Sequence, residues 1–405
     1  MPTRPFRTER WLTGHVRDIL DFYYPTCIDD EHGGYIAQLS DRDGHVYDDR
    51  SKLLVATARF VFNFSAGTLL DGPEWCHDAA AHGVDFLLDV HRAEDGGYPW
   101  LLSGRDVADD ARTCYGHAFV LLGLSMAARA GVERARPAVD ETAALIDEHF
   151  WEDEHGLCKG KLDAEWGETE AYRGQNANMH ACEALIAAHE TTGEARYLDR
   201  AYTIADRLAR ELADEGDGLV WEHYDADWTH DWTYNRDQPT HLFRPWGYQP
   251  GHLLEWTKLL LQLADYREEA WLVERGEHFF EAAVEYGWDD DHGGFVYNVD
   301  RDGAVISAEK YYWPLAEGVA AAARLAEATG DDRYWEWYDR IWEYTWEHVV
   351  NRDHSTWYFK LTPDNRVHDD IDASPSVKTD YHPLGACYDV IRATGDHGTR
   401  RSPSW

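Results

Sequence analysis

The chain has 405 residues and carries 76 acidic against 38 basic side chains, which gives a formal net charge of −38. A field of that sign repels phosphate, so neither nucleic acid nor an anionic membrane is expected as a partner. The sequence has no apolar run of about 18 residues and no hydrophobic signal region at its N-terminus. We therefore expect a cytoplasmic protein.

The acidic side chains are spread along the whole chain rather than gathered in a tail. They indicate a solvated surface suited to high salt, where screening weakens the repulsion between like charges. A cation-binding role is the alternative. Six cysteines occur without a CxxC pair or a regular spacing, so we expect reduced and mostly buried thiols.

A short acidic turn that runs into a strand, usually aromatic, recurs six times. The turns lie at 29–35, 94–98, 153–157, 215–219, 289–295 and 352–357. An internal repeat of this length, with no Pro/Ser/Gly-rich linker, favours one closed array over several domains. We therefore predict a single catalytic domain over 1–395, followed by a short tail at 396–405.

Each turn is predicted to join an amphipathic helix to a more apolar one. The amphipathic helices are expected near 7–25, 74–90, 137–150, 195–213, 267–287 and 332–349. The apolar helices are expected near 51–65, 112–130, 178–192, 250–265, 313–329 and 383–393. Six buried helices that alternate with six amphipathic ones predict an all-α fold, an (α/α)6 barrel with short β-hairpins and loops at one mouth. An open helical solenoid is the alternative.

One interval between turns is longer than the others, with 76 residues between Gly218 and Gly294. It contains a segment dense in aromatic and polar groups at 221–234, and then Arg244 within 243–248. Extra loop length before a buried helix is typical of a functional site. A packed loop without a function is the alternative.

Unusual polar and aromatic residues lie at the starts of the apolar helices. They are His180, His252, Glu255, Trp313, Glu317 and His382. Because the inner helices of such a barrel run parallel, their N-termini share one mouth, and we expect these side chains to converge there. Any one of these histidines alone is more often a structural residue than a functional one.

The same helix starts carry residues that favour helix initiation. Pro250, Pro314 and Pro383 fall in the predicted first turns, where proline loses no hydrogen bond. Asn176 or Asn178 is expected to cap the third apolar helix.

A helix N-terminus disfavours the imidazolium, so a histidine there stays neutral and able to accept a proton near neutral pH. This suits general acid and base catalysis. The histidines form neither HxH nor HExxH, so zinc is not expected. Arg59, within an apolar helix, must meet either a structural carboxylate or a ligand oxygen. Tyr115 begins the next apolar helix and is a further candidate.

Four segments of the chain stand out in order. They are Arg173-Gly-Gln-Asn-Ala-Asn-Met-His-Ala-Cys-Glu-Ala184, Pro250-Gly-His-Leu-Leu-Glu-Trp256, Lys310-Tyr-Tyr-Trp-Pro-Leu-Ala-Glu317 and Lys378-Thr-Asp-Tyr-His-Pro383. Together they resemble the N-acylglucosamine 2-epimerase superfamily, over nearly the whole chain. The resemblance implies an (α/α)6 barrel that acts on a monosaccharide without a metal ion or another cofactor, as a monomer or a homo-oligomer.

The resemblance also implies which residues act. The functional positions fall on Arg59, Tyr115, His180, Arg244, His252, Glu255, Trp313, Glu317 and His382. His382 is then the base that moves a proton between C2 and C1 of the sugar, and His252 opens the sugar ring. The other residues hold or orient the substrate.

The Arg173-Gly-Gln-Asn-Ala-Asn-Met-His180 run of the first motif and the Glu255-Trp-Thr-Lys-Leu-Leu260 continuation of the second are most similar to the mannose and sulfoquinovose isomerase branch. They imply an aldose–ketose isomerase that interconverts D-mannose and D-fructose, and also D-lyxose and D-xylulose, through a cis-enediol. A 2-epimerase or a sulfoquinovose isomerase of the same family is the first alternative. A glycoside hydrolase, which would need two opposed carboxylates, and a sugar-binding protein remain further alternatives.

Overall fold

The computed structural model describes residues 5–368 and 378–395, so the predicted tail at 396–405 lies outside the described residues. The described chain divides into two compact units. We call residues 23–248 with 378–381 the N-terminal unit, and residues 5–22, 249–368 and 382–395 the C-terminal unit. A single catalytic domain over 1–395 stays a prediction.

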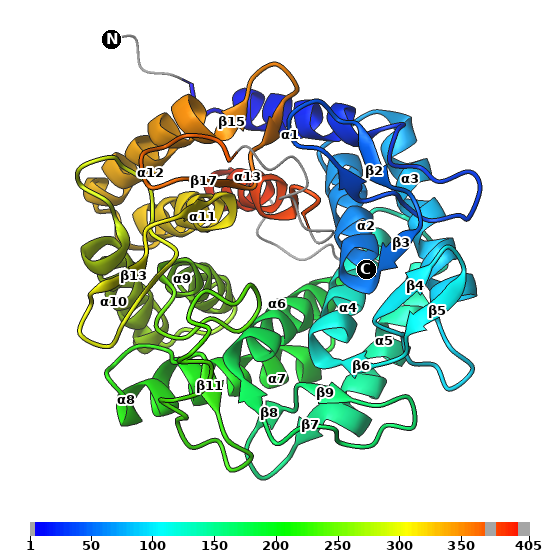
Figure 1. Ribbon diagram of the computed structural model, residues 1–405, viewed down its shortest axis with the longest axis horizontal. Coiled ribbons are helices and arrows are strands. Elements are labelled where there is room, and N and C mark those ends of the chain that lie inside the picture. The colour runs from blue at the N-terminus through cyan, green and yellow to red at the C-terminus, as the bar shows by residue number, and fades with distance from the viewer. Residues whose placement is uncertain (1–4, 369–377, 396–405) are drawn as a thin grey trace. The chain divides into compact units, whose positions relative to one another are not determined.

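The N-terminal unit is built on three buried helices, each paired with an amphipathic one. The buried helices are α2 (Leu54–Leu69), α4 (Cys114–Arg129) and α6 (Gln175–Thr192). Their amphipathic partners are α3 (Glu74–Phe86), α5 (Ala135–Leu145) and α7 (Ala195–Ala205), and the short α8 (Ala213–Glu215) follows. Within this unit α4 lies between α2 and α6 (Figure 1).

The C-terminal unit repeats the same arrangement. Its buried helices are α9 (Pro250–Ala264), α11 (Tyr312–Thr329) and α13 (Tyr381–Thr394). The amphipathic helices are α1 (Glu9–Tyr23), α10 (Ala270–Gly287) and α12 (Asp332–Tyr344). The predicted alternation of buried and amphipathic helices is therefore confirmed in both units.

The buried helices are apolar on nearly every side, as α4 shows. All of its residues from Gly116 to Ala127 are buried, so packing rather than solubility decides its composition. Thr113 caps it by accepting the amide hydrogen of Gly116 at 3.1 Å. Pro250 occupies the first turn of α9, as predicted.

The predicted asparagine cap of α6 is wrong. The helix begins at Gln175, so Asn178 lies too far inside it to act as a cap. The Asn178 side chain instead accepts a hydrogen bond from the Cys158 amide at 2.7 Å and donates one to the Cys158 carbonyl at 3.0 Å. It thereby ties a β-hairpin strand to the helix.

The amphipathic helices bury one stripe each. In α12 the buried residues are Tyr334, Tyr338, Ile341, Trp342 and Tyr344, a spacing that follows the helical period. Four of these helices continue into π-helical turns: η1 (Leu87–His91), η2 (Ile146–Phe150), η3 (Asp206–Leu212) and η4 (Thr345–Val349). The wider turns explain why the predicted helices ran on to residues 90, 150, 213 and 349.

Each of the six predicted turns follows an amphipathic helix and precedes the next buried helix, and each contains a residue with positive φ. Gly34 has φ +66°, and a Cβ there would lie 2.7 Å from the Phe86 ring, so only glycine fits. The sixth turn uses Ser355 at φ 62° instead. Behind the first turn, the buried Tyr35 ring packs against Phe60 of α2, which is how the turn joins the core.

The strands are short and pair antiparallel. They are β1 (Gln38–Leu39), β2 (Val46–Asp48), β3 (Ser51–Leu53), β4 (Leu101–Ser103), β5 (Asp106–Asp109), β6 (Arg112–Thr113), β7 (Trp151–Glu152), β8 (Leu157–Cys158), β9 (Lys161–Leu162), β10 (Arg173–Gly174), β11 (His223–Tyr224), β12 (Asn298–Val299), β13 (Val305–Ser307), β14 (Lys310–Tyr311), β15 (Val350–Asn351), β16 (Thr356–Trp357) and β17 (Lys360–Leu361). A strand just before a buried helix pairs with a strand of the next repeat, in β3–β4, β6–β9, β10–β11 and β14–β17. These pairings link neighbouring repeats at the helix starts.

All six cysteines are buried, as predicted, and none of them forms a disulfide in the structure. Among the described helices, none combines the length and the apolar character needed to cross a membrane.

Candidate active site

Eight of the nine predicted site residues lie at the starts of the six buried helices, as the sequence predicts. Arg59, His180, Glu255 and Glu317 are each the sixth residue of their helix. Tyr115, Trp313 and His382 are second residues, and His252 is a third. The ninth, Arg244, lies in the long insertion before α9.

In the C-terminal unit, α9, α11 and α13 bring five of these residues together. We call His252, Glu255, Trp313, Glu317 and His382 the His382 cluster. His382 Nδ1 lies 2.7 Å from Glu317 Oε1. Because an ionised carboxylate only accepts hydrogen bonds, the proton of the neutral imidazole is on Nδ1 and the lone pair on Nε2. The pair therefore orients a histidine whose Nε2 can take up a proton.

Trp313 contacts both histidines of the cluster. Its ring centre lies 5.1 Å from that of His252 and 5.8 Å from that of His382. A Cβ on Gly251 would lie 2.4 Å from the indole, so the absence of a side chain there lets Trp313 reach this position. The indole thus forms an apolar surface that touches two histidine rings.

Sequence reasoning missed Lys258 of α9. Its ammonium lies 2.8 Å from Glu317 Oε2 and 3.9 Å from Glu255 Oε1, and its side chain is buried. Lys258 follows His252 and Glu255 at spacings of six and three, on an otherwise apolar helix. This spacing could have identified Lys258 from the sequence, because a charged residue on the buried face of an apolar helix needs a partner of opposite charge.

Glu255, Glu317 and His382 also offer ligand atoms within 4.8 Å of one another, which suits a metal ion. Lys258 already supplies a positive charge to both carboxylates. The ammonium of Lys258 therefore already compensates the charge of the two carboxylates, so these residues do not require a metal ion. Proton transfer is the chemistry that these groups support directly.

In the N-terminal unit, α2, α4 and α6 bring together three further predicted residues. The Arg59 guanidinium donates a hydrogen bond to the Tyr115 hydroxyl at 3.2 Å. The Tyr115 ring lies 5.2 Å from the His180 ring, edge to face. Arg59 also lies over the Phe119 ring at 4.4 Å. A buried guanidinium held among rings is a donor for sugar hydroxyls or for developing negative charge.

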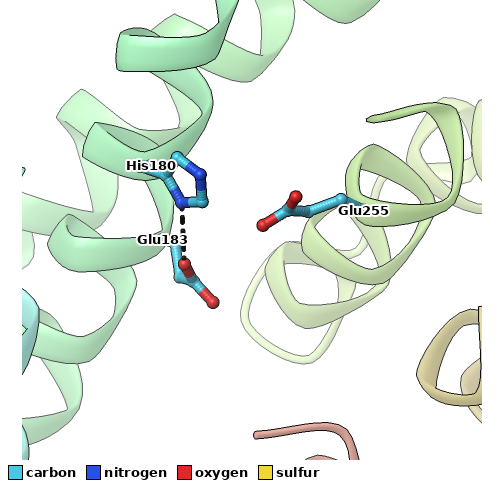
Figure 2. A group of neighbouring side chains, drawn as sticks. All are labelled: His180, Glu183 and Glu255. Atoms are coloured by element: carbon cyan, nitrogen blue, oxygen red, sulfur yellow. Dashed lines mark hydrogen bonds and ion pairs between the residues drawn. The ribbon is translucent and has the colours of Figure 1, made fainter. Parts of the chain in front are cut away.

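Two residues missed by sequence reasoning complete this group. His180 Nδ1 lies 3.3 Å from Glu183 Oε2 on the same helix, the bond that Figure 2 shows. Tyr381 donates its hydroxyl hydrogen to the same oxygen at 2.7 Å, and its ring lies 5.0 Å from the Arg59 guanidinium carbon. Figure 2 also draws Glu255 of α9. The spacing of three between His180 and Glu183 was the available signal.

Arg244 belongs to a different group of the N-terminal unit. Its guanidinium donates to both oxygens of Glu170, at 3.0 and 2.6 Å, and to the Tyr234 hydroxyl at 2.8 Å. It lies over the Tyr172 ring at 4.0 Å. Burial alone would lower the pKa of Arg244, but the interactions with Glu170, Tyr172 and Tyr234 together raise it. Glu170 and Arg244 lie 74 residues apart with no regular spacing, so the sequence could not have identified Glu170 as the partner of Arg244.

Comparisons with known proteins agree with these features. The family described as N-acylglucosamine 2-epimerase (GlcNAc 2-epimerase) matches residues 34–386. A D-mannose isomerase from Marinomonas mediterranea is 41% identical over 388 residues, which cover 96% of this chain and 98% of the relative. A D-mannose isomerase from Thermobifida fusca is 36% identical over 87% of each chain.

A crystal structure of a D-mannose isomerase superimposes with a TM-score of 0.93 at 41% identity, over 96% of this chain and 99% of the other. This likeness confirms the predicted fold class, an all-α (α/α)6 barrel. The resemblance to the family is likewise confirmed.

Proposed function

We propose that this chain, which belongs to the N-acylglucosamine 2-epimerase family, is an aldose–ketose isomerase that interconverts D-mannose and D-fructose. D-lyxose and D-xylulose are a further substrate pair. The observation that carries the proposal is the hydrogen bond between His382 Nδ1 and Glu317, in a chain 41% identical to a D-mannose isomerase.

His382 is the base in this proposal. Its Nε2 removes the C2 proton of the open-chain aldose, the electron pair moves to form the C1–C2 double bond, and O1 takes a proton from solvent. The resulting cis-enediol receives the proton from Nε2 at C1, while the C2 hydroxyl releases its own proton to solvent and becomes the ketone. Glu317 stabilises the imidazolium formed between the two steps, because it accepts the Nδ1 hydrogen.

His252 opens and closes the sugar ring in this proposal, by moving a proton on and off the ring oxygen. Its contact with Trp313, which also touches His382, supports a role beside the base. Arg59, Tyr115, His180, Arg244, Glu255, Trp313 and Glu317 are proposed to bind or orient the substrate. The reaction moves only protons, so it needs no cofactor and no metal ion.

Epimerisation at C2 is the second candidate, because it uses the same intermediate and differs only in the carbon and face to which the proton returns. The description of the matching family as an N-acylglucosamine 2-epimerase supports this second candidate. Sugar chromatography of products from mannose, lyxose, glucose, cellobiose, N-acetylglucosamine and sulfoquinovose, with EDTA present, separates the two activities. Fructose from mannose supports the proposal. Glucose as the sole product from mannose would replace it with a 2-epimerase.

We further propose that the protein works in the cytoplasm at high salt, as a monomer or a homo-oligomer, with 1–395 acting as one catalytic domain. The net charge of −38 supports the salt preference, because self-repulsion weakens when ions screen it. The urea midpoint of unfolding is expected to rise as KCl increases from about 0.1 M to about 2 M. A midpoint that stays constant over this range would count against the salt preference.

A further inference from the structure

We propose that Lys258 is a positioning residue of the isomerase, which keeps His382 neutral and Glu317 oriented toward it. This inference rests on the proposed function only in giving His382 its role as the base. The contacts that support it all lie within the C-terminal unit.

One carboxylate links the lysine to the histidine. Glu317 meets Lys258 Nζ with Oε2 at 2.8 Å, and it meets His382 Nδ1 with Oε1 at 2.7 Å. With one oxygen on each partner, the carboxylate has little freedom to rotate. Lys258 therefore fixes the direction from which Glu317 approaches the imidazole.

The charges of the cluster do not balance without the lysine. Glu255, Glu317 and Lys258 are exposed to only 1, 2 and 6%. Buried carboxylates require compensating positive charge. If the ammonium is removed, two carboxylates face one imidazole, and the imidazole is the strongest base of the three. His382 then takes up a proton and can no longer act as a base.

Other ionisable groups near Lys258 are held by partners of their own. Asp389 of α13 interacts electrostatically with Lys258; burial alone would raise the pKa of this carboxyl, but Arg324, Gln262 and Lys258 lower it. Arg324 binds both Asp389 oxygens at 2.6 Å, and it also binds Asp265 at 3.0 Å. His252 reaches His382 through the Trp313 ring, which does not titrate.

The positive charge of Lys258 beside Glu317 disfavours the His382 imidazolium, so it lowers the pKa of His382. The Glu317 carboxylate favours the imidazolium, so it raises that pKa. Lys258→Met is therefore expected to raise the pKa of His382 by about one unit, and Lys258→Arg to leave it close to the wild-type value. Glu317→Gln is expected to lower it.

The activity of the Lys258 variants should depend on pH and on the charge at position 258, which a loss of packing alone would not produce. At neutral pH, Lys258→Met is expected to reduce kcat by up to about tenfold, because a rise of about one unit in the pKa of His382 removes up to that share of the neutral base, with a smaller change in KM. Because the base is protonated rather than lost, part of this activity should return as the pH is raised. Lys258→Arg should retain most of the activity.

The deciding experiment is an NMR titration of the His382 ring in the full chain without sugar, with the signal assigned by comparison with His382→Gln. We expect a higher titration midpoint for His382 in Lys258→Met than in the wild type. In Lys258→Arg we expect a midpoint close to the wild-type value. Lys258→Gln supplies a second uncharged variant if Lys258→Met does not fold. Lys52→Met, which removes another buried lysine, from its pair with Asp29, should leave the midpoint unchanged.

An unchanged midpoint in the uncharged variants would overturn the inference, as would an equal shift in Lys52→Met. The titration does not depend on turnover. Failure of the wild-type protein to make fructose from mannose would therefore overturn the proposed function alone.

Discussion

Apart from Arg244, the residues proposed to act occupy two positions of the buried helices, the second or third residue and the sixth. At the first of these positions the backbone amides have no partner within the helix, so the local field favours a neutral imidazole. One turn further on, the sixth residue lies on the neighbouring part of the same face. This is why Glu317 of one helix can hold His382 of the next.

The position of the Trp313 indole depends on the missing side chain of Gly251. Replacing Gly251 with alanine places a methyl group where the indole lies, because a Cβ would approach the ring to 2.4 Å. The indole must move away from His252 and His382, and kcat/KM for mannose is expected to fall by about 10²-fold. Steady-state kinetics with a circular dichroism check of folding measures this.

Gly14→Ala is the matched control, because a Cβ at Gly14 of α1 meets no atom within 4 Å. Its activity should equal that of the wild type, and its stability should rise by up to about 1 kcal/mol, because alanine favours a helix. Normal kinetics in Gly251→Ala would contradict the assigned role of the indole.

At the scale of elements, an ion pair with a buried lysine or arginine recurs between the turn region and the strand that precedes a buried helix. The pairs are Asp29–Lys52, Asp95–Arg112, Glu152–Arg173 and Asp289–Lys310. Each joins the two ends of a repeat, so the turn that follows an amphipathic helix also anchors the start of a buried one. The repeat is thus stabilised at the end that carries the proposed site residues.

Asp289→Asn tests this arrangement. Burial alone would raise the pKa of Asp289, but Lys310 and the backbone amides of His292 and Asp291 lower it. A lowered carboxyl pKa stabilises the fold above the unfolded value of about 3.9 and loses that contribution as the pH falls below it. The variant should lose about 3 kcal/mol at pH 7 and less at pH 3.

Urea unfolding from pH 2.5 to 7 measures this difference, with the exposed neighbour Asp290→Asn as the control. Equal losses at both ends of the pH range would argue against the ion pair as the cause.

Local patterns in the sequence predicted the helices and the helix starts, because each depends on hydrophobic period and on turn residues. They were less informative where partners are distant in sequence. Asn178 was predicted to be a cap but binds Cys158, twenty residues earlier. Glu170 reaches Arg244 across 74 residues without any repeated spacing. Lys258 had a spacing signal, but its partner Glu317 comes from another helix.

At the scale of the whole molecule, buried histidines away from the His382 cluster set the response to mild acid. Burial lowers the pKa of both His91 and His117 to about 4. In the unfolded chain these groups bind protons below about 6.5. Their contribution to stability is therefore complete above pH 6.5 and is lost as the pH falls toward 4.

Each of these histidines is expected to reduce the free energy of unfolding by at most about 1.4 kcal/mol per pH unit within that window. Urea unfolding between pH 4.5 and 7.5 measures the slope, and His117→Asn should make it shallower. A slope in the variant as steep as in the wild type would show that other groups control the response.

His382 is proposed to carry a proton between C2 and C1 of a sugar. An NMR experiment that follows the conversion of D-mannose in D2O, for the wild type and for His382→Gln, tests this role. We expect fructose with deuterium at C1, together with deuterium at C2 of recovered mannose, and neither product with the variant. Fructose formation by His382→Gln at a rate near that of the wild type would contradict it.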